Sequence, residues 1–267
     1  MDFLIKETIE EYHAQRKDHL SSHQLADFRR CPDLYNQKRQ GLIVDKDRPA
    51  YIIGRAAHTM ILEGWEVYDN TYAKGGPINK ATGHPYGTAT KKFQEWEAEQ
   101  GRPVLTNAQD ELIQNLRKGV EKHKRSTDLL SKGQPEGVVR IQYQGIKCQI
   151  RMDWFRTDEG IVDLKTCDDL TFFEHDARRY GYIHQMAFYR AVLAERTCTP
   201  TNMYLPKVHI IAVEKKEPFR CGAWKLGDEV LGIAQKENEE AIERLKHCEA
   251  TNTWPTGYEE VRDFSFA

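Results

Sequence analysis

The sequence lacks clustered cysteines, long apolar runs and a strong net charge, and each absence narrows the class of protein. Six cysteines stand far apart along the 267 residues without a CxxC pair, so neither a disulfide framework nor a structural zinc site is expected. No apolar run approaches the roughly 20 residues that a membrane-spanning helix needs. The net charge is −2, so binding to a polyanion requires local basic patches.

A secretion signal is also missing from the first residues. The segment MDFLIKETIEEYH has acids where a signal peptide has a basic and then an apolar stretch. We therefore expect a cytoplasmic protein with no membrane contact. Hydrophobic residues make up 39% and charged residues 30% of the chain, which is enough for a packed core.

Helical patterns dominate the first half of the chain. Ser21 or Ser22 is expected to cap a helix that Pro32 interrupts. Apolar residues recur at helical spacing over 50–68, and further helices are predicted over 88–101 and 107–130. Residues 70–87 are rich in glycine, proline and asparagine and predict a surface flap beside the substrate channel.

The pattern changes to alternation after Gly137. A hairpin over 137–155 turns at Gly145, and a third strand follows over 160–167. Beyond it the sequence predicts, in order, a buried helix, a clear strand over 207–215, a weaker strand and a long charged helix from Asp228. These elements predict an α/β fold with a central mixed sheet flanked by helices.

We interpret the chain as a single domain with three parts. The N-terminal helical elaboration covers residues 1–50, and the core covers residues 51–215. A C-terminal strand, helix and aromatic tail cover residues 216–267.

The segment RMDWFRTDEGIVDLKT, residues 151–166, carries the chemistry. Asp163 and Lys165 share one face of their strand because side chains alternate along a strand. For Asp153 to lie opposite Asp163, the pairing must centre on residue 158. That register needs an odd-length loop or a bulge, for which Gly160 offers a positive φ.

Two carboxylates and a lysine on one face are suited to metal-assisted phosphodiester hydrolysis. Carboxylates hold hard cations such as Mg²⁺, the carbonyl of Leu164 is a further candidate ligand, and Lys165 is placed to orient or deprotonate water or to stabilise the transition state. Read alone, however, a D-x-K triplet also fits an ordinary solvated strand face. His58 likewise fits a hydrogen-bonded core histidine as well as a metal ligand.

Four motifs in order add to these residues: G-x-x-x-H at 54–58, R-x-D at 151–153, D-x-K-T at 163–166 and Y-x-x-Q-x-x-x-Y at 182–189. The early SSHQLADFRRCPDLY is similar to a serine-to-Cys-Pro opening. In this set the chain resembles the PD-(D/E)xK nuclease superfamily, and within it the exonuclease VIII (RecE)-like phage recombination exonucleases. The resemblance implies a restriction-endonuclease-like core.

The resemblance also implies roles for the site residues. Metal ligands would be His58, Asp153, Asp163 and the Leu164 carbonyl, with Lys165 catalytic. Catalytic or substrate-lining roles would extend to Gln185 and Tyr189, for which helix packing is the alternative, and to Glu136, for which a strand-flanking surface acid is the alternative.

Basic side chains give candidate phosphate contacts. Arg29 and Arg30 stand among aromatic residues, and Lys122 and Lys124 make the end of a predicted helix positive. We interpret all four, with Tyr189, as DNA-binding candidates. Solvated helix faces, and cations placed favourably at a helix C-terminus, remain alternatives for the basic residues.

The function that the resemblance implies is a Mg²⁺-dependent exodeoxyribonuclease, with Mn²⁺ as a substitute. It would degrade the 5′-ended strand of linear double-stranded DNA and leave 3′ tails for recombination by single-strand annealing. An endonuclease or nickase of the same superfamily and a catalytically degenerate DNA-binding or assembly module are the alternatives.

The implied partners are double-stranded DNA ends, a RecT-like single-strand annealing protein and further copies of the chain in a ring-shaped homo-oligomer, in a bacterial or phage-infected cell. Some relatives hold an iron–sulfur cluster on one early and three late cysteines. The late cysteines here are too dispersed for that pattern, so no cluster is predicted.

Overall fold

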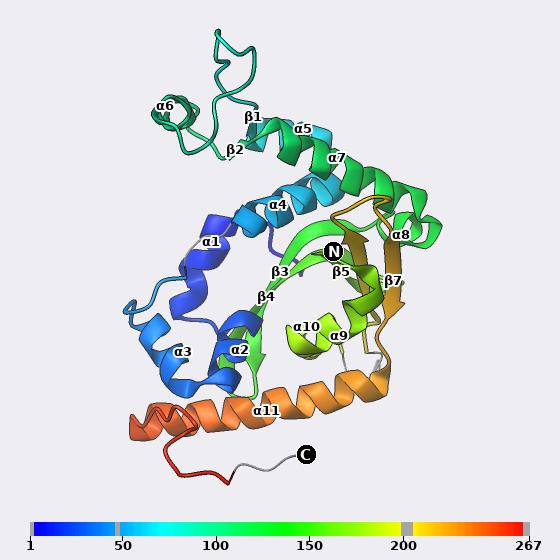
Figure 1. Ribbon diagram of the computed structural model, residues 1–267. Helices are drawn as coiled ribbons and strands as arrows, with labels where there is room; N and C mark the ends of the chain where they lie inside the picture. The colour runs from blue at the N-terminus through cyan, green and yellow to red at the C-terminus, as the bar shows by residue number, and fades with distance from the viewer. Residues whose placement is uncertain (1–2, 46–48, 199–204, 264–267) are drawn as a thin grey trace.

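A five-stranded mixed sheet forms the centre of the molecule (Figure 1). The computed structural model describes residues 3–45, 49–198 and 205–263. In spatial order the strands are β3 (Gln134–Tyr143), β4 (Ile146–Arg156), β5 (Gly160–Cys167), β6 (Val208–Glu214) and β7 (Cys221–Lys225). Neighbouring strands are antiparallel except β5 and β6, which are parallel. The predicted α/β class with a mixed sheet is confirmed.

Helices cover both faces of this sheet. One face carries α2 (Ser22–Arg30) and α10 (Tyr182–Thr197), with α11 (Asp228–Thr251) packed against α10, and the other carries α4 (Pro49–His58), α7 (Asn107–Lys122) and α8 (Lys124–Leu129). The remaining described helices are short: α1 (Ile9–Ala14), α3 (Pro32–Arg39), α5 (Trp65–Thr71), α6 (Lys91–Glu99) and α9 (Phe173–Arg179), with a π-helical turn at Thr59–Glu63 and 3-10 turns at Gln15–Lys17 and Leu170–Phe172.

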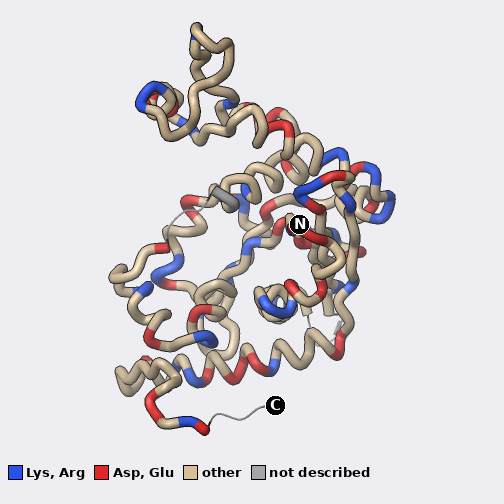
Figure 2. Tube along the Cα trace, viewed as in Figure 1, with Lys and Arg blue, Asp and Glu red and all other residues tan. Residues whose placement is uncertain are grey.

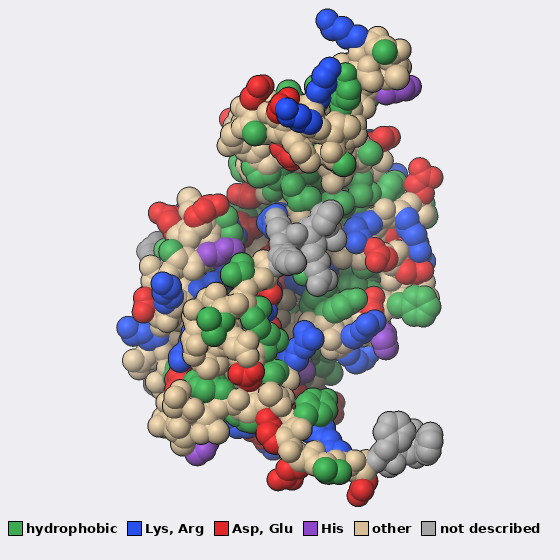
Figure 3. Space-filling view, turned by 60° about the vertical axis from the view of Figure 1, so that its left-hand side comes forward, with side chains coloured by type: hydrophobic (Ala, Val, Ile, Leu, Met, Phe, Trp, Pro, Cys, Tyr) green, Lys and Arg blue, Asp and Glu red, His purple; other side chains and the backbone are tan. Residues whose placement is uncertain are grey.

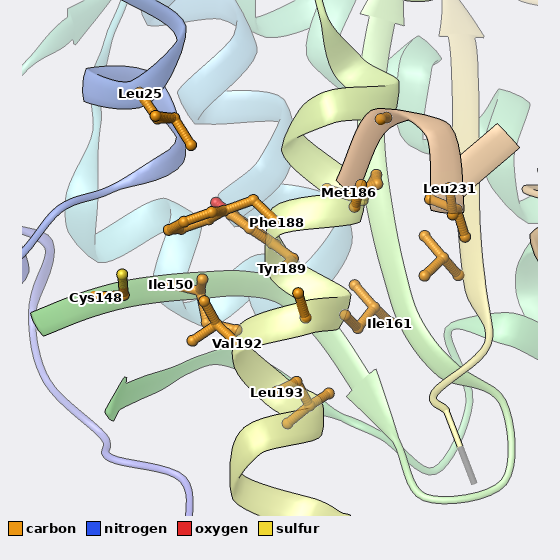
Figure 4. Close-up of a cluster of buried hydrophobic side chains, with 14 of the residues drawn as sticks. Leu25, Cys148, Ile150, Ile161, Met186, Phe188, Tyr189, Val192, Leu193 and Leu231 are labelled. Carbon is orange, nitrogen blue, oxygen red and sulfur yellow. The ribbon is translucent and has the colours of Figure 1, made fainter. Parts of the chain in front are cut away.

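The main core lies between the sheet and α10 (Figure 4). Helix α10 is buried along most of its length, so its apolar side chains contact strands on one side and α2 and α11 on the other. Burial of each large apolar side chain is worth about 1.5–3 kcal/mol. A second cluster, on the opposite face, joins α4, α7 and α8 to β5 and β6.

Local capping explains where the N-terminal helices begin. Ser21, one of the two predicted caps, accepts a hydrogen bond from Gln24 N at 3.4 Å, and Gln24 Oε1 accepts one from Ser21 N at 2.9 Å. Helix α3 starts at Pro32 after the extended residue Cys31, because proline fits the first turn of a helix and cannot continue the one before it.

Two predicted helices are divided. The helix predicted over 107–130 breaks at His123, which is extended and whose Nδ1 accepts from Ser126 N at 3.2 Å, giving α7 and α8. The helical pattern over 50–68 forms α4, the π-helical turn and then α5, because Gly64 has φ +93°. Apolar periodicity continues across both breaks, so it does not reveal them.

Residues 73–105 form an arm that stands away from the sheet (Figure 1). Its base is a two-residue parallel pairing of β1 (Ala73–Lys74) with β2 (Val104–Leu105). Residues 73–87 of the segment predicted as a surface flap lie in this arm, whereas residues 70–71 are the end of α5. None of the described helices is long and apolar enough to cross a membrane.

Candidate metal centre and catalytic site

The site begins where β4 and β5 separate. Their three pairs run from Arg156 opposite Gly160 to Trp154 opposite Val162, so the register centres on residue 158 across a three-residue turn. Gly160 has φ +73°, as the predicted odd loop requires. The next pair in this register would be Asp153 and Asp163, which confirms the predicted alignment of the two strands.

Asp153 bridges the opening between these strands. Instead of continuing the ladder, its carboxylate accepts a hydrogen bond from the backbone amide of Leu164 at 2.8 Å. The N–H and C=O of one strand residue point to the same edge. The Leu164 carbonyl, a predicted ligand, therefore also faces the side of β5 on which Asp153 lies.

Glu136 meets Asp153 from the other side. It lies inside β3, between Pro135 and Gly137, which corrects the expectation that it precedes the strand. It has φ +56°, a conformation that costs a non-glycine residue roughly 1–2 kcal/mol. Backbone strain of this kind is found preferentially at functional sites.

A kink at this point turns side chains between the two faces of β4. Met152 packs in the main core and Trp154, two residues later, packs in the second core, although residues two apart share a face in a regular strand. Asp153 sits at the change of face, opposite the strained Glu136. The kink is therefore what brings both carboxylates toward α4.

His58 completes this group from α4. It is the last residue of α4, directly before the π-helical turn, and its Nδ1 lies 3.4 Å from Asp153 Oδ2. Its side chain is 26% exposed, whereas Ala56 and Ala57 beside it are fully buried. One ligand atom each from His58, Glu136 and Asp153 lies within 4.8 Å of the others.

Asp163 and Lys165 form the second half of the site. Asp163 is 1% exposed, and Lys165 Nζ lies 2.6 Å from its Oδ2. Burial raises the pKa of Asp163 to about 6, although Lys165 opposes the shift. Burial lowers the pKa of Lys165, but the charges of Asp163 and Asp153 outweigh it, so the net pKa is raised and the ammonium persists.

The donor set fits a divalent cation. It contains one imidazole and three carboxylates, which are ligands that Mg²⁺ and Mn²⁺ accept. Within the described residues, neither oxygen of Asp163 has a hydrogen bond of good geometry. Burial, followed by the charge of Asp153, raises the pKa of Glu136 to about 8 against the opposing Arg151. A bound cation would offset the burial and the mutual repulsion of these carboxylates and so stabilise their charged forms.

Helix α10 supplies the wall beside Lys165. The Tyr182 ring lies 4.8 Å from Lys165 Nζ, in a cation–π contact, and Gln185 Nε2 donates to Tyr189 Oη at 3.3 Å. Tyr189 is 5% exposed within the main core, and burial raises its pKa. Its placement corrects its choice as a DNA-contacting residue, because a core side chain does not reach a duplex.

The basic candidates are not gathered at the acids. Arg29 is half-buried and donates from Nη1 to Asn238 of α11, so it joins two helices, while Arg30 is exposed. Lys122 and Lys124 are exposed at the α7–α8 junction. Helix α8 packs at the β4–β5 turn, where Arg125 Nη2 lies 2.9 Å from Glu159.

Two site residues had no role in the sequence analysis. Arg151 Nε lies 3.2 Å from Glu136 Oε2 and opposes its raised pKa, and Tyr182 lies beneath the ammonium of Lys165. Both stand in the quoted motifs, as the arginine of R-x-D and the first tyrosine of the helix motif. Motif membership was therefore a usable signal, but the partner of each was visible only after folding.

A family model described as a PDDEXK-like domain of unknown function matches residues 21–263. The chain belongs to this family. Membership confirms the resemblance to the PD-(D/E)xK superfamily, and the site lies within the matched range. No curated protein matches the sequence.

Solved structures support the fold. The chain is similar to a protein from Eubacterium rectale named "Putative exonuclease", at 18% identity and a TM-score of 0.70, over 98% of this chain and 97% of that one. It is also aligned with LHK-Exo in complex with dAMP, at 16% identity and a TM-score of 0.31, over 62% and 85% of the two chains. The second value is too low to carry an argument.

Proposed function

We propose that the chain is a divalent-metal-dependent deoxyribonuclease that uses Mg²⁺, with Mn²⁺ as a substitute. The observation that supports this most is the meeting of His58, Glu136 and Asp153 within 4.8 Å, beside the buried Asp163–Lys165 pair. These residues come from the three consecutive strands β3, β4 and β5 and from the distant helix α4. A merely solvated strand face does not need an imidazole from α4.

The side chains of the site divide the chemistry between them. A bound cation supplies a Lewis acid for the phosphoryl oxygen and for water. Lys165 Nζ, held by Asp163 Oδ2 and by the Tyr182 ring, presents positive charge and a proton donor to the charge that develops on the phosphate. Leu164 N and His58 orient the Asp153 carboxylate, and Gln185 lines the same wall.

The proposed substrate is linear double-stranded DNA, digested from the 5′ end of one strand to leave a 3′ tail for annealing. Family membership and the full-length similarity to a protein named as an exonuclease support this choice. A RecT-like annealing protein and a ring of further copies are proposed partners.

End-labelled duplexes test the proposal directly. In Mg²⁺ we expect linear duplexes labelled at the 5′ end to release their label early and duplexes labelled at the 3′ end to keep theirs. A chelator should stop the digestion of both duplexes. Early release of the 3′ label would show that digestion starts at the 3′ end, opposite to the proposed polarity. The absence of any digestion in Mg²⁺ or Mn²⁺ would favour the alternative function, a catalytically degenerate DNA-binding or assembly module.

A covalently closed circle separates exonuclease from endonuclease. An exonuclease needs an end, so we expect the closed circle to survive conditions that consume the same DNA after linearisation. Nicking or cutting of the circle at a comparable rate would favour the endonuclease or nickase.

A further inference from the structure

The arm, residues 73–105, is a preorganised protrusion with its own small core. Ala73, Phe93 and Val104 are buried together, with Trp96 and Tyr86 packed against them. Its outer hairpin is fixed by backbone hydrogen bonds, from Asn79 N to His84 O at 2.8 Å and from Tyr86 N to Pro77 O at 2.9 Å. The chain at the tip is thus held in place by contacts within the arm.

The base of the arm is fixed to the helix that carries His58. Leu105, at the end of the arm, and Tyr72, just before it, are buried in one cluster with Ala56 and Met60, on either side of His58. Tyr68 in the same cluster donates to Asp110 at 2.6 Å. Whatever the arm contacts is therefore positioned relative to α4 and the metal centre.

The outer hairpin of the arm and the first turn of α6 carry charged side chains of one sign only. Residues 70–94 contain four lysines, one histidine and no acid, so they carry +4; the chain carries −2, which leaves −6 on all other residues. Lys80 lies exposed at the hairpin tip and Lys91 is 89% exposed. Figure 2 marks positions of Lys and Arg along the chain of the arm, and the space-filling view in Figure 3 shows basic side chains at its outer end.

Helix α6 strengthens this polarity. Lys91 and Lys92 occupy its first turn, and Glu97 and Glu99 its last. A helix dipole favours the reverse arrangement, acids first and bases last, by about 0.3–1 kcal/mol per charge. The unfavourable order adds the positive end of the helix dipole to the charge of the two lysines, and Lys92 Nζ donates to Tyr86 Oη of the outer hairpin at 3.0 Å.

We propose that the arm is a nucleic-acid clamp that holds the phosphate backbone of duplex DNA flanking the site, through Lys80 and Lys91. The inference rests on the proposed function, since the duplex is the substrate. Among the large hydrophobic side chains that the structure describes in the arm, Ile78 alone is exposed, at 55% of its surface. One apolar side chain is too little for an interface with another copy. Exposed lysines suit phosphates, and the solvated Lys91–Glu95 ion pair at 3.6 Å is weak enough to leave Lys91 able to bind one.

The test compares two double variants that remove equal charge. Lys80→Gln/Lys91→Gln changes the arm, and Lys236→Gln/Lys246→Gln changes α11. The two pairs are matched because Lys91 and Lys236 each have an i,i+4 ion pair with a glutamate. Binding of a labelled duplex is measured with Ca²⁺ in place of Mg²⁺ over a salt series. Each lost phosphate contact removes about one unit of the log–log salt slope, so the arm variant should lose about two units and bind roughly tenfold more weakly in moderate salt.

The outcomes separate the clamp from the nuclease. Hydrolysis of bis(p-nitrophenyl) phosphate, a substrate too small to reach the arm, should be equal in wild type and both variants. Equal duplex binding and salt slopes in the two variants, with wild-type digestion intact, would overturn the clamp alone. A changed mass in sedimentation for the arm variant would overturn it in favour of a contact between copies. Loss of digestion by the wild type would instead count against the proposed function.

Discussion

Lys165 depends on two neighbours for its position. Its ammonium lies 2.6 Å from Asp163 and 4.8 Å from the centre of the Tyr182 ring, and it is enclosed between β5 and α10. Neutral side chains of similar length keep the packing but remove the charge that faces the phosphate.

We predict that Lys165→Gln lowers the rate of DNA hydrolysis by about 10²- to 10⁴-fold, the range for loss of a charged or proton-donating group. Lys215→Gln is the matched control, because Lys215 also pairs with an aspartate, Asp168, at 2.8 Å. Digestion rates in Mg²⁺ and circular dichroism of both variants measure the effect. Equal rates for the two variants would exclude Lys165 from the site.

Glu136 gives a pH dependence whose sign follows from its environment. Burial and Asp153 raise the pKa of Glu136 to about 8 from an ordinary 4.5. A carboxyl whose pKa is higher in the folded protein stabilises the fold fully below its unfolded pKa. That stability is lost as pH rises through about 8.

We therefore predict that metal-free wild type loses more unfolding free energy between pH 6 and 9 than Glu136→Gln does. The glutamine has no charge to bury as pH rises. Urea unfolding in a chelator at the two pH values measures the difference. A larger loss in the variant would contradict the burial of a protonated Glu136.

At the scale of elements, the β4–β5 turn sets the alignment of the site. Gly160 has φ +73°, and a Cβ there would lie 2.1 Å from the carbonyl oxygen of Lys207, the residue just before β6. Both the turn and the approach of β6 therefore require glycine.

We expect Gly160→Ala to destabilise the protein by about 2 kcal/mol or more, combining an unfavourable φ with a backbone clash. Gly227→Ala is the control, because Gly227 has φ −72° and nothing within 4 Å of its added Cβ. Urea midpoints of the two variants give the comparison. An unchanged midpoint for Gly160→Ala would show that β6 adapts freely.

At the scale of the whole molecule, the candidate metal centre and catalytic site link both faces of the sheet. His58 comes from α4 on one face, and Lys165 contacts Tyr182 of α10 on the other. A cation bound between elements of this kind stabilises the complete fold, because the unfolded chain does not hold its ligands together.

We predict that Mg²⁺ or Mn²⁺ raises the melting temperature and that a chelator reverses the rise. At 100 times the dissociation constant, the stabilisation is about 2.7 kcal/mol. His58→Gln should fold without metal and show a smaller rise at the same metal concentration. If His58→Gln failed to fold, the histidine would be a core residue instead of a ligand. An equal rise in the melting temperature of wild type and His58→Gln would show that His58 is not a metal ligand.

The sequence by itself determined the strand order through the hairpin and the condition on the β4–β5 register under which Asp153 lies opposite Asp163; the structure meets that condition. Local rules suffice for these: alternation fixes which side chains share a face, and the parity of a loop fixes which residues oppose each other. The motif residues of the site were also readable, because a few motifs in a fixed order carry them.

Only the tertiary structure decided the partners of those residues. The kink that turns Asp153 and Glu136 toward His58, the burial of Tyr189 and the use of Arg29 to join α11 depend on contacts between elements far apart in the chain. No local pattern encodes such contacts, because they arise from the packing of whole helices on a twisted sheet. Burial then sets the pKa of Glu136 and Asp163, which the residue type alone leaves open.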